Sequence, residues 1–307
     1  MQICFIGIGS IGKRHILNLK EILGDKVQID VLRSGNGSLL SDEIRKCVRK
    51  ECFSSAELEN KYDAVFITNP TAMHYVTLEK YLEKSDSFFI EKPVFVTGEE
   101  DVSVFLESKK TFYVACPLRY TNVIRYLKEN VDFSEIYAMR CISSSYLPDW
   151  RVGTDYTKSY SAHKSMGGGV SIDLVHEWDY VRYLVGEPNY VKSIISKKSN
   201  LQISSDDIAT YIAEYDDKIV EIHLDYFGRN PIRNIELFGK NDTLCVDILN
   251  QQVIWRNAGK HLDLSQDRDE YQRRELQHFF DIISGKVGND NDLCTAMNVL
   301  QIARGVK

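Results

Sequence analysis

The sequence predicts an α/β protein of two domains, in which a doubly wound parallel sheet is followed by an α+β domain with a large, mostly antiparallel sheet. Two observations lead to this fold class. Over the first 120 residues, short apolar runs alternate with helical patterns, which is typical of a parallel sheet covered by helices. After residue 120, strand-like segments follow one another with turn residues between them, which favours antiparallel pairing.

The expected elements of the first region alternate in type along the chain. They are, in order, ICFIGI, a helix near 11–23, VQIDVL, a helix near 41–50, AVFIT, a helix near 72–83, SFFIEK, a helix near 98–109, and TFYVAC. Each strand is short and largely apolar, as expected for strands that are buried on both faces. We assign residues 1–120 to the first domain.

The second region contains mainly strands, with turn residues such as Asp216-Asp217 between them. The expected strands lie within EIYAMRCISSSY, YVKSIISKKS, IATYIAEYD, KIVEIHLDYF, RNIELFGK, DTLCVDIL and QQVIWRN. Helical patterns near 269–284 and 291–304 close the chain. The second domain is therefore expected over 121–290, and 291–307 is expected as a C-terminal helix, for which packing back on the first domain is one arrangement.

Composition narrows the class of protein and of partner. The 307 residues are 43% hydrophobic and carry a formal net charge of -6, with lysine and arginine spread along the chain. This distribution lacks the basic patch of a nucleic-acid binder and favours a small-molecule partner. We find no stretch of about 20 apolar residues and no secretory leader, so we expect a cytoplasmic protein without a membrane segment. The seven cysteines form no C-x-x-C pair, so neither disulfides nor a metal site is expected.

A glycine motif, G-I-G-S-I-G, directly follows the first strand and opens the first helix. In this position glycines permit a tight turn and the close approach of a pyrophosphate, whose charge is met by N–H groups at the helix N-terminus. The motif predicts a dinucleotide site. The alternative is a purely structural turn. The expected contacts are Gly7, Gly9, Ser10, Ile11 and Gly12.

The end of the second expected strand bears on the choice between NAD and NADP. An acid there would bind the ribose 2′-OH, whereas an arginine nearby can accept a 2′-phosphate. The chain has Leu32, Arg33 and Ser34 at this point, and Asp30 lies inside the strand. Arg33 and Ser34 therefore favour NADP. In the alternative, Arg33 is a solvated loop residue and NAD binds through backbone contacts.

Two further segments carry ionisable groups. Glu91-Lys92-Pro93 follows the strand SFFI, so Lys92 is expected beside the crevice where parallel sheets bind ligands, unless it is a simple surface lysine. In GGGVSIDLVHEWD, at 167–179, a helix after Gly169 would place Asp173, His176 and Tyr180 on one face. A histidine there suits proton exchange near neutral pH. The alternative is that Asp173 caps the helix and His176 has a structural role.

Together these motifs resemble the Gfo/Idh/MocA oxidoreductases. The similarity rests on G-I-G-S-I-G, T-N-P-T-A-M-H at 68–74, E-K-P at 91–93, P-L-R-Y at 117–120 and G-G-G-x-x-x-D-x-x-H-E-x-D at 167–179, and it spans nearly the whole chain. The resemblance implies a Rossmann domain, an open-faced C-terminal sheet, and a catalytic group of Lys92, Asp173 and His176. It also implies cofactor contacts from Thr68, Asn69, Pro70, His74, Glu91 and Lys92, although His74 is equally open to a structural role.

One departure from the family pattern concerns the catalytic pair. In the commoner pattern the histidine follows the aspartate by four residues, and here the gap is three. Both spacings share a helix face, but the choice of base between Asp173 and His176 stays open. The D-L-x-H-E-x-D run is closest to members associated with sugar and surface-polysaccharide metabolism.

The chemistry expected is hydride transfer between NADP or NAD and a secondary hydroxyl or ketone of a sugar or polyol. The expected substrate contacts are Arg119, Tyr120, Trp150, Arg151 and Tyr160, because aromatic rings beside charges suit a polyol. Alternatively, the loop before the glycines packs against a neighbouring subunit. Two other functions stay open, a glycosidase that oxidises its sugar transiently and a dinucleotide-binding sensor. A homodimer or homotetramer is expected through the open sheet face, with Ile222, Leu224, Ile235 and Leu237 on it.

Overall fold

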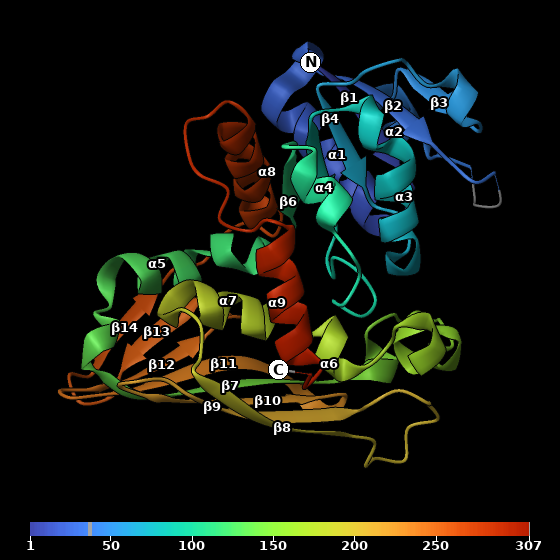
Figure 1. Ribbon diagram of the computed structural model, residues 1–307. Helices are drawn as coiled ribbons and strands as arrows, with labels where there is room; N and C mark the ends of the chain where they lie inside the picture. Colours follow the sequence, from blue (N-terminus) through green and yellow to red (C-terminus); the bar gives the residue numbers. More distant parts are fainter. Residues whose placement is uncertain (36–38, 307) are drawn as a thin grey trace. The chain divides into compact units, whose positions relative to one another are not determined.

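The computed structural model describes residues 1–35 and 39–306 and divides them into two compact units (Figure 1). The first unit comprises Met1–Ala115 and Gln272–Met297, and the second comprises Cys116–Tyr271 and the chain from Asn298 onward. This division differs from the expected boundaries at 120 and 290, because 272–297 groups with the first unit. Among the described residues, no helix is long and apolar enough to cross a membrane.

Side-chain contacts explain why the late segment joins the first unit. The Asn289 side chain donates to the Phe112 carbonyl at 2.7 Å, and the Asn291 side chain donates to the Val114 carbonyl at 2.7 Å. The Phe279 ring packs edge to face on Phe66, with 5.6 Å between ring centroids. These contacts are long-range, so helical periodicity alone could not assign the segment to a domain.

The first unit is built on six parallel strands in the order β3-β2-β1-β4-β5-β6. The strands are β1 (Gln2–Ile6), β2 (Gln28–Leu32), β3 (Lys50–Cys52), β4 (Ala64–Ile67), β5 (Ser87–Ile90) and β6 (Thr111–Val114). The helices are α1 (Ser10–Leu23), α2 (Asp42–Cys47), α3 (His74–Tyr81), α4 (Ser103–Glu107) and α8 (Glu270–Ile283). The strand order reverses between β1 and β4, which is the switch point where such sheets bind ligands. The short strand β3 was not expected, since a helix was predicted up to residue 50.

The second unit contains an eight-stranded sheet in the order β14-β13-β12-β11-β7-β10-β9-β8. Its strands are β7 (Ile136–Tyr146), β8 (Tyr190–Ser196), β9 (Ile208–Glu214), β10 (Ile219–Asp225), β11 (Phe227–Gly239), β12 (Thr243–Asp247), β13 (Gln252–Trp255) and β14 (Lys260–Asp263). All neighbouring strands are antiparallel except β7 and β10, which are parallel. The expected fold class, a Rossmann-like parallel sheet with a second, mostly antiparallel sheet, is confirmed.

Helices cover one face of the second sheet (Figure 1). They are α5 (Asn122–Asn130), α6 (Val170–Asp173), α7 (His176–Val185) and the end of α9 (Leu293–Ala303), and their apolar residues join the core of this unit. In the described part of the chain, no helix lies on the opposite face, so the sheet is open-faced as expected.

The residues expected on the open face are on the covered face instead. Ile222, Leu224, Ile235 and Leu237 are fully buried in the core. The open face carries the residues between them in the strands, and its apolar members include Ile194 and Ile212, which are 70% and 53% exposed. Because side chains alternate along a strand, an error of one position moves every residue to the other face. Isoleucine occurs on both faces of β10, so composition did not show which alternate residues of the strand point toward the core.

Candidate functional site

The glycine motif forms the turn between β1 and α1. Gly7 has φ +87°, and a Cβ placed there would lie 2.6 Å from the Asn69 Cα. A Cβ on Gly12 would lie 2.8 Å from the Thr68 Oγ1. A Cβ on Gly9, in contrast, would meet nothing within 4 Å. Two of the three glycines are therefore required by the fold itself, whereas Gly9 keeps space open at the helix N-terminus.

Helix α1 begins at Ser10, directly after Gly9, without a side-chain cap and without an acidic residue in its first turn. An uncapped N-terminus presents N–H groups and the positive end of the helix dipole, which together favour an anion. Ser10, Ile11 and Gly12 form this first turn. The residues present thus fit the pyrophosphate of a dinucleotide.

A second loop, after β4, is attached to the glycine turn. The Thr68 hydroxyl donates to the Gly7 carbonyl at 2.6 Å, and the Asn69 side chain donates to the Thr77 hydroxyl at 2.7 Å. Pro70 precedes a short 3₁₀ turn at Thr71–Met73. The expected contacts from 68–70 therefore lie together with Gly7 at the carboxyl ends of β1 and β4.

Arg33 and Ser34 follow β2, and Arg33 already has an acidic partner. Its guanidinium forms an ion pair with the carboxylate of Glu51 in β3 and lies over the Phe53 ring. Asp30 is buried and bound by the Arg49 guanidinium at 2.8 and 2.5 Å. An acid is thus present at the end of β2 after all, but it comes from the neighbouring strand. Sequence reasoning missed Glu51 because it predicted no strand there.

Lys92 follows β5, is half-buried, and is joined to Pro93 by a cis peptide bond. The preceding residue, Glu91, is buried, and its carboxylate lies 2.5 Å from the His15 ring on α1. Burial raises the pKa of Glu91, but the hydrogen bond and the charges of His15 and Lys92 outweigh it, so the pKa falls below its usual value. Glu91 therefore connects the lysine segment to the helix of the glycine motif, and its expected contact with the cofactor stays a prediction.

His74 also has a structural position. It is 1% exposed, and its two ring nitrogens lie 3.1 Å from the Val94 carbonyl and 3.0 Å from the Asn69 carbonyl. Burial lowers the pKa of His74. Both ring nitrogens face backbone carbonyls, so the side chain joins the 68–70 loop to the segment after Lys92. Of the two roles left open for His74, these contacts give the structural one, and a cofactor contact stays a prediction.

In the second unit, the glycine run at 167–169 packs against backbone and carboxylate oxygens. A Cβ on Gly168 would lie 2.0 Å from the Tyr160 carbonyl oxygen, and one on Gly169 would lie 2.2 Å from the Asp206 Oδ1. Asp206 in turn accepts the Ser171 N–H at 2.9 Å. The run thus lets the chain enter α6 at a point where no side chain fits.

The expected single helix after Gly169 is interrupted. Helix α6 ends at Asp173 and α7 begins at His176. Between them the Val175 N–H donates to the Ile172 carbonyl and the Glu177 N–H to the Leu174 carbonyl, each at 3.2 Å, which is the i to i−3 pattern of a 3₁₀ turn. Residues three apart eclipse in such a turn, so the three-residue spacing from Asp173 to His176 suits the tightened backbone.

Tyr180, the third residue expected on this face, is fully buried, and its hydroxyl lies beside the Cys141 thiol of β7. His176 and Tyr180 are four residues apart within α7, so the break between the helices changes only their relation to Asp173.

Asp173 is 3% exposed and lies beside two tyrosines. The Tyr226 hydroxyl donates to its Oδ2 at 2.5 Å, and the charge of Asp173 acts on the Tyr160 hydroxyl. Burial, and then the charge of Asp173, raise the pKa of both tyrosines. Both hydroxyls therefore keep their protons beside the carboxylate.

Trp150 and Arg151, two more of the expected substrate contacts, lie near Tyr226 and Tyr160. The Trp150 ring packs edge to face on Tyr226, with 5.2 Å between centroids, and the charge of Arg151 acts on Tyr160. Sequence reasoning missed Tyr226, which joins them. The available signal was its position directly after a strand, in the run D-Y-F at 225–227.

Arg119, another expected substrate contact, is bound to a different carboxylate. It is 2% exposed, and its guanidinium binds both oxygens of Asp179 in α7, at 2.9 and 2.6 Å. A buried guanidinium requires such a partner, so Arg119 has a structural role, and its contact with substrate stays a prediction. Tyr120, its neighbour in the 3₁₀ turn Pro117–Tyr120, is half-buried.

Comparison with known families agrees with this arrangement. Residues 1–112 match the family described as "Oxidoreductase family, NAD-binding Rossmann fold", and residues 124–245 match the GFO/IDH/MocA C-terminal domain. The chain belongs to the Gfo/Idh/MocA oxidoreductase family. It is thus a member of an oxidoreductase family with an NAD-binding first domain.

Among curated proteins, the chain is 25% identical over 187 residues to an uncharacterized oxidoreductase of Bacillus subtilis, covering 59% of this chain and 52% of that protein. It is 24% identical over 195 residues to an inositol 2-dehydrogenase/D-chiro-inositol 3-dehydrogenase of Lacticaseibacillus casei, covering 61% of this chain and 54% of that protein. The chain thus spans about half the length of these two relatives. A third, a scyllo-inositol 2-dehydrogenase of Bacillus subtilis, is 24% identical over 267 residues, or 77% of this chain and 72% of that protein.

Among solved structures, the fold resembles UDP-N-acetylglucosamine 3-dehydrogenase from Acidithiobacillus ferrooxidans, with a TM-score of 0.77 and 20% identity over 100% of this chain and 96% of that one. It also resembles levoglucosan dehydrogenase in complex with NADH and levoglucosan, with a TM-score of 0.82 and 18% identity over 100% and 95% of the two chains. At these identities the likeness establishes the fold.

Proposed function

We propose that the protein is an NAD-dependent dehydrogenase or reductase that transfers a hydride between the nicotinamide and a secondary hydroxyl or ketone of a sugar or polyol. The observation that carries this proposal is Asp173, a buried carboxylate that accepts the Tyr226 hydroxyl, lies beside Tyr160 and is followed, across a 3₁₀ turn, by His176. The relatives named for inositols and sugars support the substrate class.

In this proposal the bound dinucleotide supplies the hydride chemistry, and the side chains move and stabilise the proton and the charge on oxygen. One oxygen of Asp173 is held by the Tyr226 hydroxyl, so in this proposal the carboxylate orients the substrate or the imidazole. His176 is then the base that removes the hydroxyl proton. Lys92 stabilises negative charge developing on the substrate oxygen.

We further propose that NAD is preferred over NADP, which reverses the preference expected from Arg33 alone. The Glu51 carboxylate pairs with the Arg33 guanidinium and would repel a 2′-phosphate, whereas it can accept a hydrogen bond from a 2′-OH. Ser34 adjoins the same point of the chain.

The test is to incubate the protein with NAD⁺ and a panel of inositols, levoglucosan and UDP-N-acetylglucosamine, and to follow nicotinamide reduction. Reduction that requires one of these compounds supports the proposal. If none is oxidised and the corresponding ketones are not reduced with NADH, the proposal fails. Release of sugar from a glycoside without net NADH formation would instead indicate a glycosidase.

We also propose that the open face of the second sheet mediates self-association. Ile194 and Ile212 are exposed on neighbouring strands of that face, and exposed apolar patches on a sheet commonly mark protein contacts. Light scattering at micromolar concentration should give a dimer or tetramer, and Ile212→Lys should shift it toward the monomer. A monomeric parent protein would rule the proposal out.

A further inference from the structure

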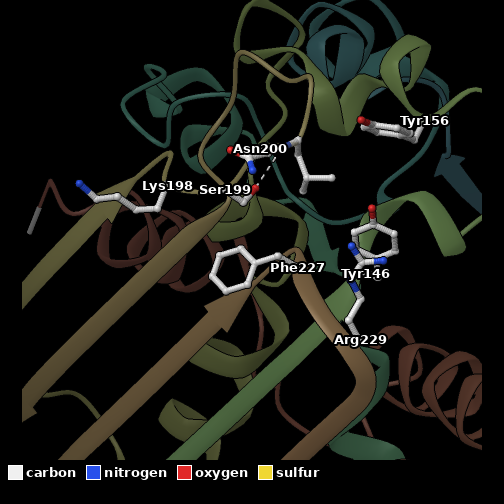
Figure 2. A pocket seen from close by; sticks show the side chains of 8 residues that line it. Tyr146, Tyr156, Lys198, Ser199, Asn200, Phe227 and Arg229 are labelled. Atoms are coloured by element: carbon white, nitrogen blue, oxygen red, sulfur yellow. Dashed lines mark hydrogen bonds between the residues drawn. The ribbon is translucent and has the colours of Figure 1, made fainter.

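A separate pocket of about 480 Å³ lies in the second unit (Figure 2). Its lining residues are Tyr146, Tyr156, Lys198, Ser199, Asn200, Leu201, Phe227 and Arg229. None of them belongs to the group around Asp173. The pocket is nevertheless close to that group along the chain, since Phe227 follows Tyr226 and Tyr156 precedes Tyr160 in the same loop.

One wall of the pocket is an irregularity at the start of β11. Phe227 pairs with Tyr146, but the register shifts before Ile232, so the residues between them bulge out of the ladder. Bulges re-aim side chains and are frequent next to binding sites. Here the bulge carries Arg229, whose guanidinium carbon lies 3.7 Å from the centroid of the Tyr146 ring.

The bulge is fixed by a buried carboxylate. Asp225 is 3% exposed, and its Oδ1 accepts the N–H groups of Phe227 at 3.0 Å and Gly228 at 2.8 Å. The Ser144 hydroxyl donates to the same oxygen at 2.9 Å. A Cβ on Gly228 would lie 1.8 Å from the Ser144 Oγ, so only glycine lets the bulge approach β7 so closely.

The opposite wall, the loop 198–201, is fixed by a second buried carboxylate. Asp207 is fully buried and accepts the N–H groups of Lys198 at 2.7 Å and Ser199 at 2.9 Å, together with the Ser199 hydroxyl at 2.6 Å. The Gln202 N–H donates to the Tyr156 hydroxyl at 3.2 Å and so holds that ring at the edge of the pocket. Both walls are therefore ordered before any ligand binds.

The pocket combines three aromatic rings with two cationic residues, Arg229 and Lys198. Tyr146, Tyr156 and Phe227 supply apolar faces, and the described part of the chain places no carboxylate in an ion pair with Arg229. Aromatic faces suit the C–H face of a sugar ring, and a guanidinium binds carboxylate or phosphate through two parallel hydrogen bonds. The volume lies within the range of small-molecule sites.

We infer that this pocket binds an acidic sugar unit, carrying a carboxylate or a phosphate, of an extended carbohydrate ligand. The choice of a sugar rests on the proposed function. Arg229 would bind the anionic group of the ligand, and the three aromatic side chains would contact its sugar ring. The pocket would then select substrates by a unit other than the one that is oxidised.

The test is calorimetric titration of the full-length protein with glucuronate, glucose 6-phosphate and glucose, without nicotinamide cofactor. At least one of the two anions should bind about tenfold or more tightly than glucose, and the stronger one identifies the anionic group. Arg229→Ala should weaken that binding by about tenfold or more. Tyr146→Phe, which keeps the aromatic ring, should still bind the anion, whereas Tyr146→Ala should lose this binding. Arg125→Ala, which removes an exposed arginine on α5, is the matched control and should change nothing.

Asp173→Asn separates this inference from the proposed function. The anion should bind this variant as it binds the parent protein, even if no sugar in the panel is oxidised. The inference is overturned if neither anion binds more tightly than glucose. It is also overturned if Arg229→Ala binds the anion as the parent does, or if Asp173→Asn abolishes the binding.

Discussion

The two glycine segments of the chain differ in what holds them. In the first unit, the turn at Gly7–Gly12 is packed against the loop after β4, but Gly9 has open space around its Cα and α1 starts without a cap. In the second unit, Gly168 and Gly169 have backbone and carboxylate oxygens where a Cβ would be. The first segment therefore leaves N–H groups at the start of α1 for a ligand to bind. The second segment is filled by contacts within the chain, and it positions Asp173.

The largest effect is expected at Lys92 and His176, the two residues that the proposal assigns to the charge and the proton on the reacting oxygen. Lys92→Ala and His176→Ala should each lower single-turnover hydride transfer by about 10²–10⁴, because each removes a group that acts on the reacting oxygen or its proton. Nucleotide affinity, measured by fluorescence titration, should stay nearly unchanged. If Asp173→Asn is the more damaging change and His176→Ala the milder, Asp173 is the base. If both alanine variants transfer hydride at the rate of the parent protein, the catalytic roles proposed for Lys92 and His176 are wrong.

The glycine comparison itself predicts a difference in stability. Gly168→Ala should lower the free energy of unfolding by about 3 kcal/mol, because the new methyl group meets a backbone oxygen that cannot move aside. Gly9→Ala should cost less than about 1 kcal/mol, since its Cβ meets nothing. Urea unfolding of the two variants measures both values. Equal losses would contradict the contrast between the two segments.

Because of the buried pair of Glu91 and His15, the free energy of unfolding should depend on pH in the acid range. Glu91 has a lowered pKa in the folded state, so its contribution is present above the pKa of the unfolded chain and is lost as pH falls through the folded pKa. Glu91→Gln should cost about 1.5–3 kcal/mol at pH 7, and less under acid conditions. Urea midpoints across pH 3–7 test this. A loss that does not change with pH would mean that the carboxylate charge is unimportant.

A smaller effect is expected at Tyr226, which acts through Asp173. Tyr226→Phe keeps the ring against Trp150 and removes one hydrogen bond to the carboxylate, so turnover should fall about tenfold. With one donor gone, the carboxylate is held less firmly, and single-turnover hydride transfer measures the loss. An unchanged rate would assign Tyr226 to packing alone.

The smallest effect concerns the cofactor. Glu51→Gln should narrow the proposed preference for NAD over NADP by about tenfold or less, because it removes the charge that opposes a 2′-phosphate while Arg33 remains. Glu57→Gln, at a carboxylate that binds the N–H groups of Phe53 and Ser54 in the next turn, is the control for local charge. A parent protein that binds both nucleotides equally would refute the preference.

The sequence was sufficient for those features that depend on local pattern. Strand and helix alternation predicted the parallel sheet, and the motif positions placed Gly7, Thr68 and Glu91 at the carboxyl ends of three neighbouring strands. Trp150, Arg151 and Tyr160 were also expected near a substrate, and the fold groups them around Asp173.

Features that depend on distant partners were not predictable in this way. The sequence did not show that Asp179 binds Arg119, because 60 residues separate the two, and Glu51 lies in a strand of only three residues. The break between α6 and α7 was not predicted, because over two residues hydrophobic periodicity does not distinguish a 3₁₀ turn from an α-helical turn. The face assignment of Ile222 failed because alternation fixes which residues share a face but not which face is covered.

The parallel neighbours β7 and β10 also determine how the second sheet can assemble. Arg140 and Glu221 meet across this pair although 81 residues separate them in the chain. The edges, in contrast, are made by hairpins such as β13 with β14, whose strands are nearly consecutive in the chain. Since closing a long loop costs chain entropy before its contacts can form, the hairpins are expected to form first and the central pairing last. The rate of folding of this unit should therefore depend on the middle of the sheet, where Asp225 and Ser144 also meet.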